Sequence, residues 1–164
     1  MPNHVHFIAV PGKEYSLSKT LSACHMCYAH YINRKNRLTG HLWQGRFYSC
    51  ILGESHLYAA VRYIENNPVR ANLVEKAWEW NWSSARAHSR EGTSKLLLGD
   101  IHRYMEVEDW KNYLCQADDK KIISAIIKNT STGRPSGSVA FVSRLEGVLN
   151  RRLRALPRGR PKNG

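Results

Sequence analysis

The stretch His4-Val5-His6-Phe7-Ile8-Ala9-Val10, followed by Pro11-Gly12, is the starting point for the fold that we predict for this chain. It is short and rich in β-branched residues, and two turn-forming residues end it, as is typical of a β-strand. A second run of this kind, Arg46-Phe47-Tyr48-Ser49-Cys50-Ile51-Leu52, lies between Gly45 and Gly53. The sequence therefore predicts two strands of a sheet, at residues 4–10 and 46–52.

Helical patterns fill most of the remaining chain. Apolar residues recur at steps of three and four between residues 16 and 36, and again from Glu54 to Asn66. Pro68 should end the second helix, because proline lacks a backbone N–H and disfavours helical geometry at the residue before it. Further expected elements are a short helical piece at 69–74, a loop at 78–84, and helices at 101–115, 118–128 and 139–150. The predicted class is α+β.

The length and the charge of the chain suggest how it is organised. Its 164 residues suit one domain with a small appendage. We predict a main domain at residues 1–98, a helical extension at 99–130, and a linker, short helix and basic tail at 131–164. Twenty-five Lys and Arg residues against 13 Asp and Glu give a net charge of +12, which favours nucleic acid as a partner.

The sequence also excludes some classes of protein. It contains no apolar run long enough to cross a membrane. The four cysteines have no spacing typical of a disulfide framework, and no signal peptide is visible at the start. We therefore expect a cytoplasmic protein with reduced thiols.

The first candidate site is the pair His4 and His6. Side chains alternate along a strand, so both imidazoles lie on one face and Val5 lies on the other. Two imidazoles at this spacing can bind one metal ion. A His-x-His pair is common by chance, and two surface histidines without a ligand are the alternative interpretation.

Three longer stretches point to a family. Met1-Pro2-Asn3-His4-Val5-His6 resembles the His-hydrophobic-His motif of the HUH endonucleases, and the match is closest to the single-tyrosine transposases associated with repetitive extragenic palindromes. Gly40-His41-Leu42-Trp43-Gln44-Gly45-Arg46-Phe47 and Arg62-Tyr63-Ile64-Glu65-Asn66-Asn67-Pro68-Val69-Arg70-Ala71 are similar to later blocks of the family, in the same order. Trp82-Ser83-Ser84 is a weaker likeness. The resemblance covers about residues 1–90.

The resemblance implies a fold. The family has a ferredoxin-like antiparallel sheet with helices packed on it, and the histidine strand lies in its centre. Two strands and a helix precede that strand in the family, whereas Met1 here falls on the motif. We therefore expect the N-terminal strands and helix to be missing, and an α-helical C-terminal region with a basic tail to follow the sheet.

The resemblance also implies a reaction. Tyr63 would attack a phosphate of single-stranded DNA and form a 5′-phosphotyrosine and a free 3′-hydroxyl, which allows strands to be nicked and rejoined during transposition of a mobile or repetitive element. Tyr63 and Asn67 are four residues apart and share one helix face. Asn67 would complete the metal site of His4 and His6, for Mg²⁺ or Mn²⁺. The alternatives are a half-buried structural tyrosine and a helix-capping asparagine.

Basic side chains are the candidate DNA contacts. The expected partner is single-stranded or hairpin DNA, bound by a nucleoid-associated bacterial protein that is a monomer or a homodimer. Gly133-Arg134-Pro135 and Gly159-Arg160-Pro161 each resemble the core of a minor-groove hook, which suggests a non-specific DNA-binding arm. A solvated basic face is the alternative. The candidates are Arg34, Lys35, Arg37, Arg46, Arg62, Arg70, Arg151, Arg152, Arg154 and Arg160.

Two other functions compete with the transposase. One is a truncated, non-catalytic DNA-binding remnant that keeps the basic surface. The other is a metal-dependent hydrolase that uses His-x-His in a different fold, although the chain is too short for the barrel that usually houses such a site.

Overall fold

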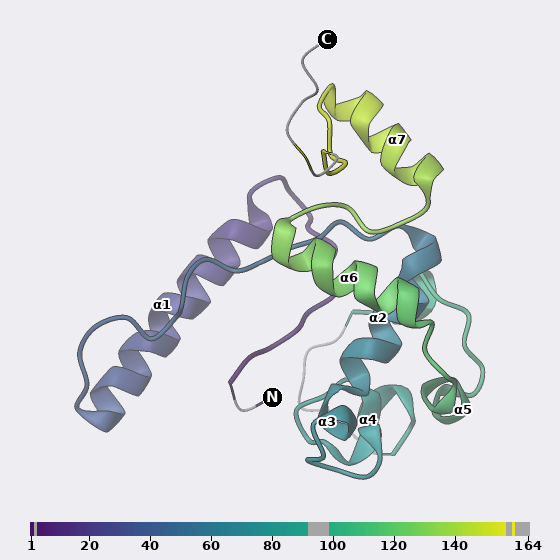
Figure 1. The fold of residues 1–164 in the computed structure, drawn as a ribbon. Coiled ribbons are helices and arrows are strands. Elements are labelled where there is room, and N and C mark those ends of the chain that lie inside the picture. The colour runs from purple at the N-terminus through teal and green to yellow at the C-terminus, as the bar shows by residue number, and fades with distance from the viewer. Residues whose placement is uncertain (2, 92–98, 157–158, 160–164) are drawn as a thin grey trace. The chain divides into compact units, whose positions relative to one another are not determined.

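The computed structural model describes residues 1, 3–91, 99–156 and 159. Within these residues the regular structure is helical, and Figure 1 shows the elements in chain order. They are α1 (Ser16–Asn36), α2 (Glu54–Glu65), α3 (Asn67–Arg70), the 3₁₀ helix η1 (Ala77–Glu79), α4 (Ala85–His88), the 3₁₀ helix η2 (Ile101–Arg103), α5 (Trp110–Cys115), α6 (Lys120–Thr132) and α7 (Val139–Leu149).

The predicted ferredoxin-like sheet is wrong. Residues 4–10 and 46–52 are not strands, and over the described part of the chain the one bridge of β type is an isolated parallel pair between Leu52 and Ser136. A β-branched run favours an extended backbone, but a strand also needs a neighbour that completes its hydrogen bonds. Phe7 and Val10 are 69% and 68% exposed, so their apolar side chains are not buried against a sheet.

The chain forms two compact units. One combines residues 1–6 with the chain from Cys50 onward, and the other is residues 7–49. In the second unit the segment after α1 folds back along that helix. Asn33 donates to the Gly40 carbonyl oxygen at 3.0 Å, and the Trp43 ring stacks on the His25 ring with 4.2 Å between their centroids.

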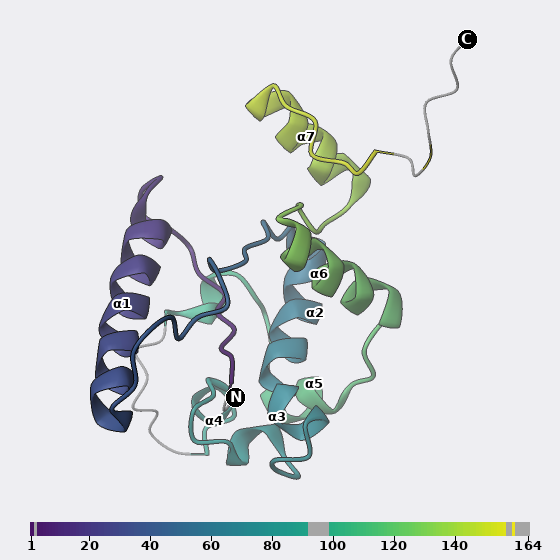
Figure 2. The ribbon, with the colours of Figure 1, turned by 60° about the vertical axis from the view of Figure 1, so that its left-hand side comes forward.

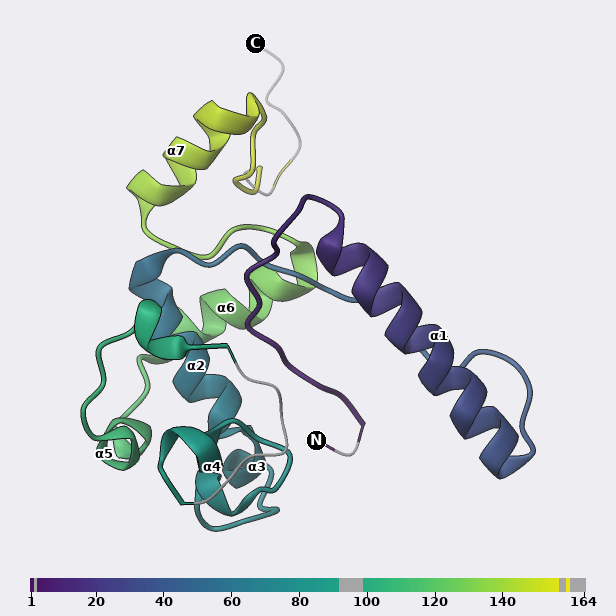
Figure 3. The ribbon, with the colours of Figure 1, turned by 180° about the vertical axis from the view of Figure 1, so that it is seen from behind.

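Helix α2 is the centre of the first unit. Its residues Ala59 and Ala60 pack against Ile126 of α6, and Figures 1 and 2 show α6 running beside α2. Val61 belongs to a second buried cluster, and α3 and α4 lie near the C-terminal end of α2 (Figures 1 and 3). The other buried members of that cluster are Ala77, Ala85, Met105, Trp110, Tyr113 and Leu114.

Three of the predicted helices agree with the structure to within one residue. The helix at 16–36 is confirmed, and those starting at Glu54 and Val139 each end one residue early. The single helix expected at 101–115 is wrong, because the structure divides it into η2 and α5. Asp109 caps α5 by accepting a hydrogen bond from the Asn112 N–H, so a new helix starts there. Among the described helices, none is long and apolar enough to cross a lipid bilayer.

Candidate active site

The first unit brings four of the predicted site residues together. The amide nitrogen of Asn67 lies 3.1 Å from Nε2 of His4. The ring centroids of His4 and His6 are 5.0 Å apart, and those of His6 and Tyr63 are 6.2 Å apart. The two histidines are exposed and Tyr63 is half-buried, so the cluster faces solvent.

The junction between α2 and α3 sets the positions of Tyr63 and Asn67. Asn66 ends α2, and Pro68 falls in the first turn of α3, where its missing N–H leaves no hydrogen bond unmade. The Asn66 side chain donates to the Leu114 carbonyl oxygen at 2.8 Å. This hydrogen bond ties the junction to α5 and orients the helix turn that carries Tyr63.

The hydrogen bonds of His4 define its tautomer. Its Nδ1 lies 2.7 Å from the Asn3 side-chain oxygen, which accepts the Nδ1 proton. Nε2 is then unprotonated and accepts from the Asn67 amide. A carbonyl oxygen that holds the remote ring N–H is the usual way in which proteins orient a metal-binding histidine.

The electrostatic surroundings keep both imidazoles neutral. Partial burial of the ring lowers the pKa of His6, and repulsion between its protonated form and a protonated His4, Arg70 or the N-terminal ammonium lowers it further. Burial and the N-terminal ammonium likewise lower the pKa of His4. Neutral imidazole is the form that binds a metal ion, so these shifts favour ligation at neutral pH.

The donor set suits a divalent cation in part. Two imidazoles and an amide group supply nitrogen and oxygen donors of the kind that Mn²⁺ accepts. In the structure the Asn67 amide turns its nitrogen to His4, and its oxygen accepts a hydrogen bond from Arg70 at 3.2 Å. A half-turn of this amide would present the oxygen beside His4. The described residues contain no group of three or more His, Cys, Asp or Glu side chains that could hold a metal ion.

Arg70 is a cation in contact with the candidate nucleophile, Tyr63. Its guanidinium carbon lies 3.9 Å from the centroid of the Tyr63 ring. It also donates to the Tyr63 carbonyl oxygen and to the Asn67 side chain. One arginine thus links the tyrosine to the asparagine and places a positive charge against the face of the Tyr63 ring.

Arg62, also predicted to contact DNA, is engaged within the protein. Its Nε donates to Asp118 at 2.8 Å, and its Nη1 donates to Gln116 at 3.0 Å. The guanidinium carbon lies 5.2 Å from the centroid of the Tyr113 ring, and the side chain is 12% exposed. Arg62 therefore joins α2 to the segment before α6 and is held away from solvent.

The sequence did not reveal a buried carboxylate that lies two residues after Tyr63 on α2. Glu65 is 1% exposed. Its Oε1 accepts from Ser84 and, at 2.8 Å, from His88, while Oε2 accepts from the Trp110 indole at 2.6 Å. The sequence feature that could have revealed Glu65 is its position four residues after Val61, on the face of α2 that is otherwise apolar.

The remaining predicted DNA contacts belong to both units of the chain. Arg34, Lys35, Arg37 and Arg46 are exposed residues of the second unit. Arg151, Arg152 and Arg154 follow α7, and Arg160 lies outside the described residues.

The first Gly-Arg-Pro stretch is a helix end rather than an extended hook. Gly133 caps α6 with a φ of 67°, and Asn129 donates to the Pro135 carbonyl oxygen at 3.0 Å. The next residue, Ser136, is buried and exchanges backbone hydrogen bonds with Ile51 and Gly53 at 2.8 Å. This tripeptide therefore joins α6 to the segment before α2.

Comparison with known proteins gives one result. The model of the family described as "Transposase IS200 like" matches residues 1–67, a segment that contains His4, His6, Tyr63 and Asn67. No match was found among the curated proteins or among the solved structures. Residues 1–67 are therefore similar to the IS200-like transposases, and this similarity covers less than half of the chain.

Proposed function

We propose that this protein is a single-tyrosine transposase of the HUH type, from the branch associated with repetitive extragenic palindromes, and that it nicks and joins single-stranded DNA. The observation that carries the proposal is the convergence of His4, His6 and Asn67 beside Tyr63, from segments about sixty positions apart in the sequence. The family match over residues 1–67 supports a role in DNA transposition.

Tyr63 acts as the nucleophile in this proposal. Its phenol oxygen forms a bond to phosphorus, the bond from phosphorus to the 3′-oxygen breaks, and the phenol proton passes to solvent. The leaving 3′-oxygen takes a proton from solvent, so the products are a 5′-phosphotyrosine and a 3′-hydroxyl. Reversal with another 3′-hydroxyl joins strands without an external energy source, because the phosphodiester bond energy is kept in the covalent link.

Arg70 and the histidines prepare the phosphate for attack. Arg70 binds a non-bridging oxygen and offsets the charge that grows as the phenol approaches. His4, His6 and Asn67 would hold Mg²⁺ or Mn²⁺, which, when bound, supplies a Lewis acid for the scissile phosphate. An extended single strand or the unpaired part of a hairpin suits this exposed cluster, and the protein would act as a monomer or a homodimer.

A covalent adduct tests the proposal. We expect the wild-type protein with Mn²⁺ to form a denaturation-resistant complex with a labelled hairpin oligonucleotide. Tyr63→Phe should abolish this complex, and Tyr58→Phe, on the same helix, should retain it. A complex that persists in Tyr63→Phe would place the nucleophile elsewhere.

A non-catalytic DNA-binding protein is the second candidate. The net charge of +12 favours it, since attraction to a phosphate backbone needs no metal and no tyrosine. It predicts salt-sensitive DNA binding without any adduct, and an affinity that His4→Ala and His6→Ala leave unchanged.

A further inference from the structure

The chain after α7 folds back on that helix instead of leaving it. Asn150 ends α7 in the left-handed region with a φ of 44°, and the Arg151 N–H donates to the Glu146 carbonyl oxygen at 3.2 Å. Asparagine is one of the few residues that adopts this conformation readily. The reversal brings residues 151–154 beside the last turns of the helix.

A single carboxylate holds this return segment. Oε1 of Glu146 accepts hydrogen bonds from the N–H groups of Leu153, at 2.8 Å, and of Arg154, at 3.0 Å. Its Oε2 lies 3.6 Å from a guanidinium nitrogen of Arg154. These N–H groups and the Arg154 charge lower the pKa of Glu146, so the carboxylate is ionised at neutral pH.

Arg154 completes the fold-back. Its guanidinium donates to the Val139 carbonyl oxygen at 3.2 Å and to the Ser143 hydroxyl. Arg154 is thus a structural residue of this segment, although the sequence suggested a DNA contact.

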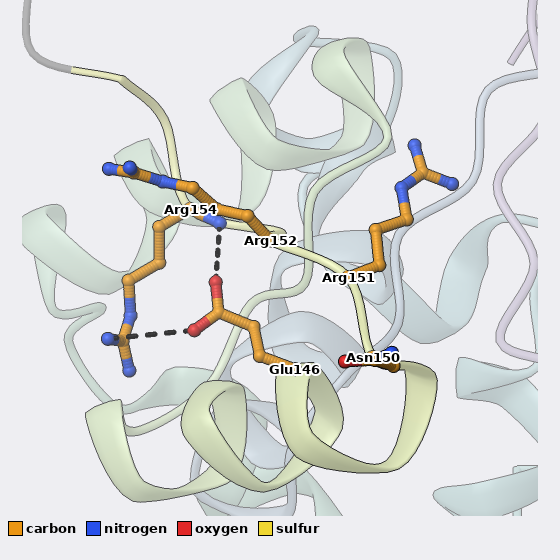
Figure 4. A pocket seen from close by; sticks show the side chains of 5 residues that line it. All are labelled: Glu146, Asn150, Arg151, Arg152 and Arg154. Atoms are coloured by element: carbon orange, nitrogen blue, oxygen red, sulfur yellow. Dashed lines mark hydrogen bonds and ion pairs between the residues drawn. The ribbon is translucent and has the colours of Figure 1, made fainter.

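The fold-back leaves two arginines for a ligand. Figure 4 shows the Arg151 and Arg152 side chains extending away from Glu146, whereas Arg154 turns toward it. Both are exposed, and neither side chain makes a hydrogen bond or an ion pair with any residue that the structure describes. Together with Asn150, Glu146 and Arg154 they line a hollow whose three cations exceed its one anion.

We propose that residues 150–154 form a preorganised phosphate-binding loop that presents Arg151 and Arg152 to the sugar-phosphate backbone of DNA. The contacts of Glu146 with Leu153 and Arg154, which we call the Glu146 clamp, hold this loop in place. The loop takes its ligand class from the proposed function but does not depend on the Tyr63 chemistry. Because the two guanidinium groups point in different directions, they suit two phosphates of an extended backbone better than one isolated phosphate. Ordering the loop in advance reduces the conformational entropy lost on binding.

The test uses two kinds of variant in a full-length Tyr63→Phe protein, so that no covalent product forms. Affinity for a labelled single strand and for the duplex of the same sequence is measured over a range of salt concentrations. Arg151→Ala with Arg152→Ala should weaken binding roughly tenfold and flatten the salt dependence, since two ionic contacts are lost. Lys121→Ala with Lys128→Ala removes the same charge from exposed positions of α6 and is the matched control.

Glu146→Ala distinguishes a loop that Glu146 holds in place from a flexible tail that binds DNA through its positive charge alone. It removes a negative charge, so a flexible basic tail would bind DNA more tightly. A preorganised loop would bind it more weakly, because the clamp is lost. Equal or tighter binding by Glu146→Ala would overturn the proposal, as would a loss in the arginine pair no larger than that in the lysine pair. Comparison of the two DNA forms shows which backbone the loop prefers, and loss of the Tyr63 adduct alone would not affect these results.

Discussion

The Asn67 amide lies 3.1 Å from Nε2 of His4, although the two residues are 63 positions apart in the sequence. This contact attaches the first six residues to the turn between α2 and α3 and brings the histidine motif to the tyrosine helix. The Arg70 guanidinium donates a hydrogen bond to the oxygen of the same Asn67 amide. The asparagine therefore links the first histidine of the motif to the arginine that lies over the Tyr63 ring.

Substitution of Asn67 tests its role as a metal ligand. Asn67→Ala should weaken Mn²⁺ binding on the order of tenfold, since it removes an oxygen donor. Asn67→Asp should strengthen binding, because a carboxylate is a better ligand for a hard cation. Titration followed by electron paramagnetic resonance measures both, with Asn112→Ala as the control. A purely structural asparagine would give weaker binding, or no change, in both variants.

Glu65 should be a major source of stability. Glu65→Ala leaves the buried donors of Ser84, His88 and Trp110 without their acceptor, and we expect a loss of about 3 kcal/mol in the free energy of unfolding. Urea denaturation measures this loss. Exposed Glu108→Ala should change the free energy by no more than about 0.5 kcal/mol. A Glu65 variant as stable as that control would refute the hydrogen-bonded network.

Two glycines near α7 should respond to alanine in opposite ways. A methyl group at Gly137 would overlap the Phe141 ring, so Gly137→Ala should destabilise the protein by about 1–3 kcal/mol. Gly147 lies inside α7, and no neighbouring atom comes within 4 Å of the place that an alanine methyl group would take there, so Gly147→Ala should stabilise the protein by about 0.5–1 kcal/mol. Thermal unfolding compares the two. Equal shifts in one direction would contradict the packing of Phe141 on Gly137.

Cysteine labelling reports the contact between the segment before α2 and the end of α6. Burial raises the pKa of the Cys50 thiol, which leaves less thiolate at pH 8 and slows alkylation. Cys24, Cys27 and Cys115 are exposed and should react with iodoacetamide first, as mass spectrometry of the labelled peptides can show. The difference should disappear in denaturant. Rapid labelling of Cys50 in the folded protein would mean that this segment is open.

Local signals in the sequence predicted the helices, whereas features that depend on contacts between distant residues could not be predicted from it. The periodicity of residues 16–36 acts within a few residues, so it can be recognised without a structure. Helix α2 does end before Pro68, but Asn67, which the proline was expected to keep out of helical geometry, begins helix α3 with Pro68 in its first turn. The run at residues 4–10 has the composition of a strand, but a strand exists only with a partner, and composition does not supply one.

The candidate site followed the same division. The motifs identified His4, His6, Tyr63 and Asn67, and the structure brings them together. The motifs could not show that Arg62 pairs with Asp118 while Arg70 covers the Tyr63 ring, since the partner of Arg62 lies 56 positions away. Glu146 was missed for a similar reason, because its role depends on a chain reversal at Asn150.

The identity of the residue that becomes bonded to DNA is the sharpest test of the proposed reaction. The protein is incubated with a single-stranded hairpin and Mn²⁺, the DNA is trimmed by nuclease, and the tryptic peptides are fragmented in a mass spectrometer. Trypsin separates Tyr63, in the peptide at 63–70, from Tyr48 and Tyr58, in the peptide at 47–62. We predict a nucleotide on Tyr63. A nucleotide on another residue, or no adduct on a hairpin that the protein binds, would contradict the assignment of Tyr63 as the nucleophile.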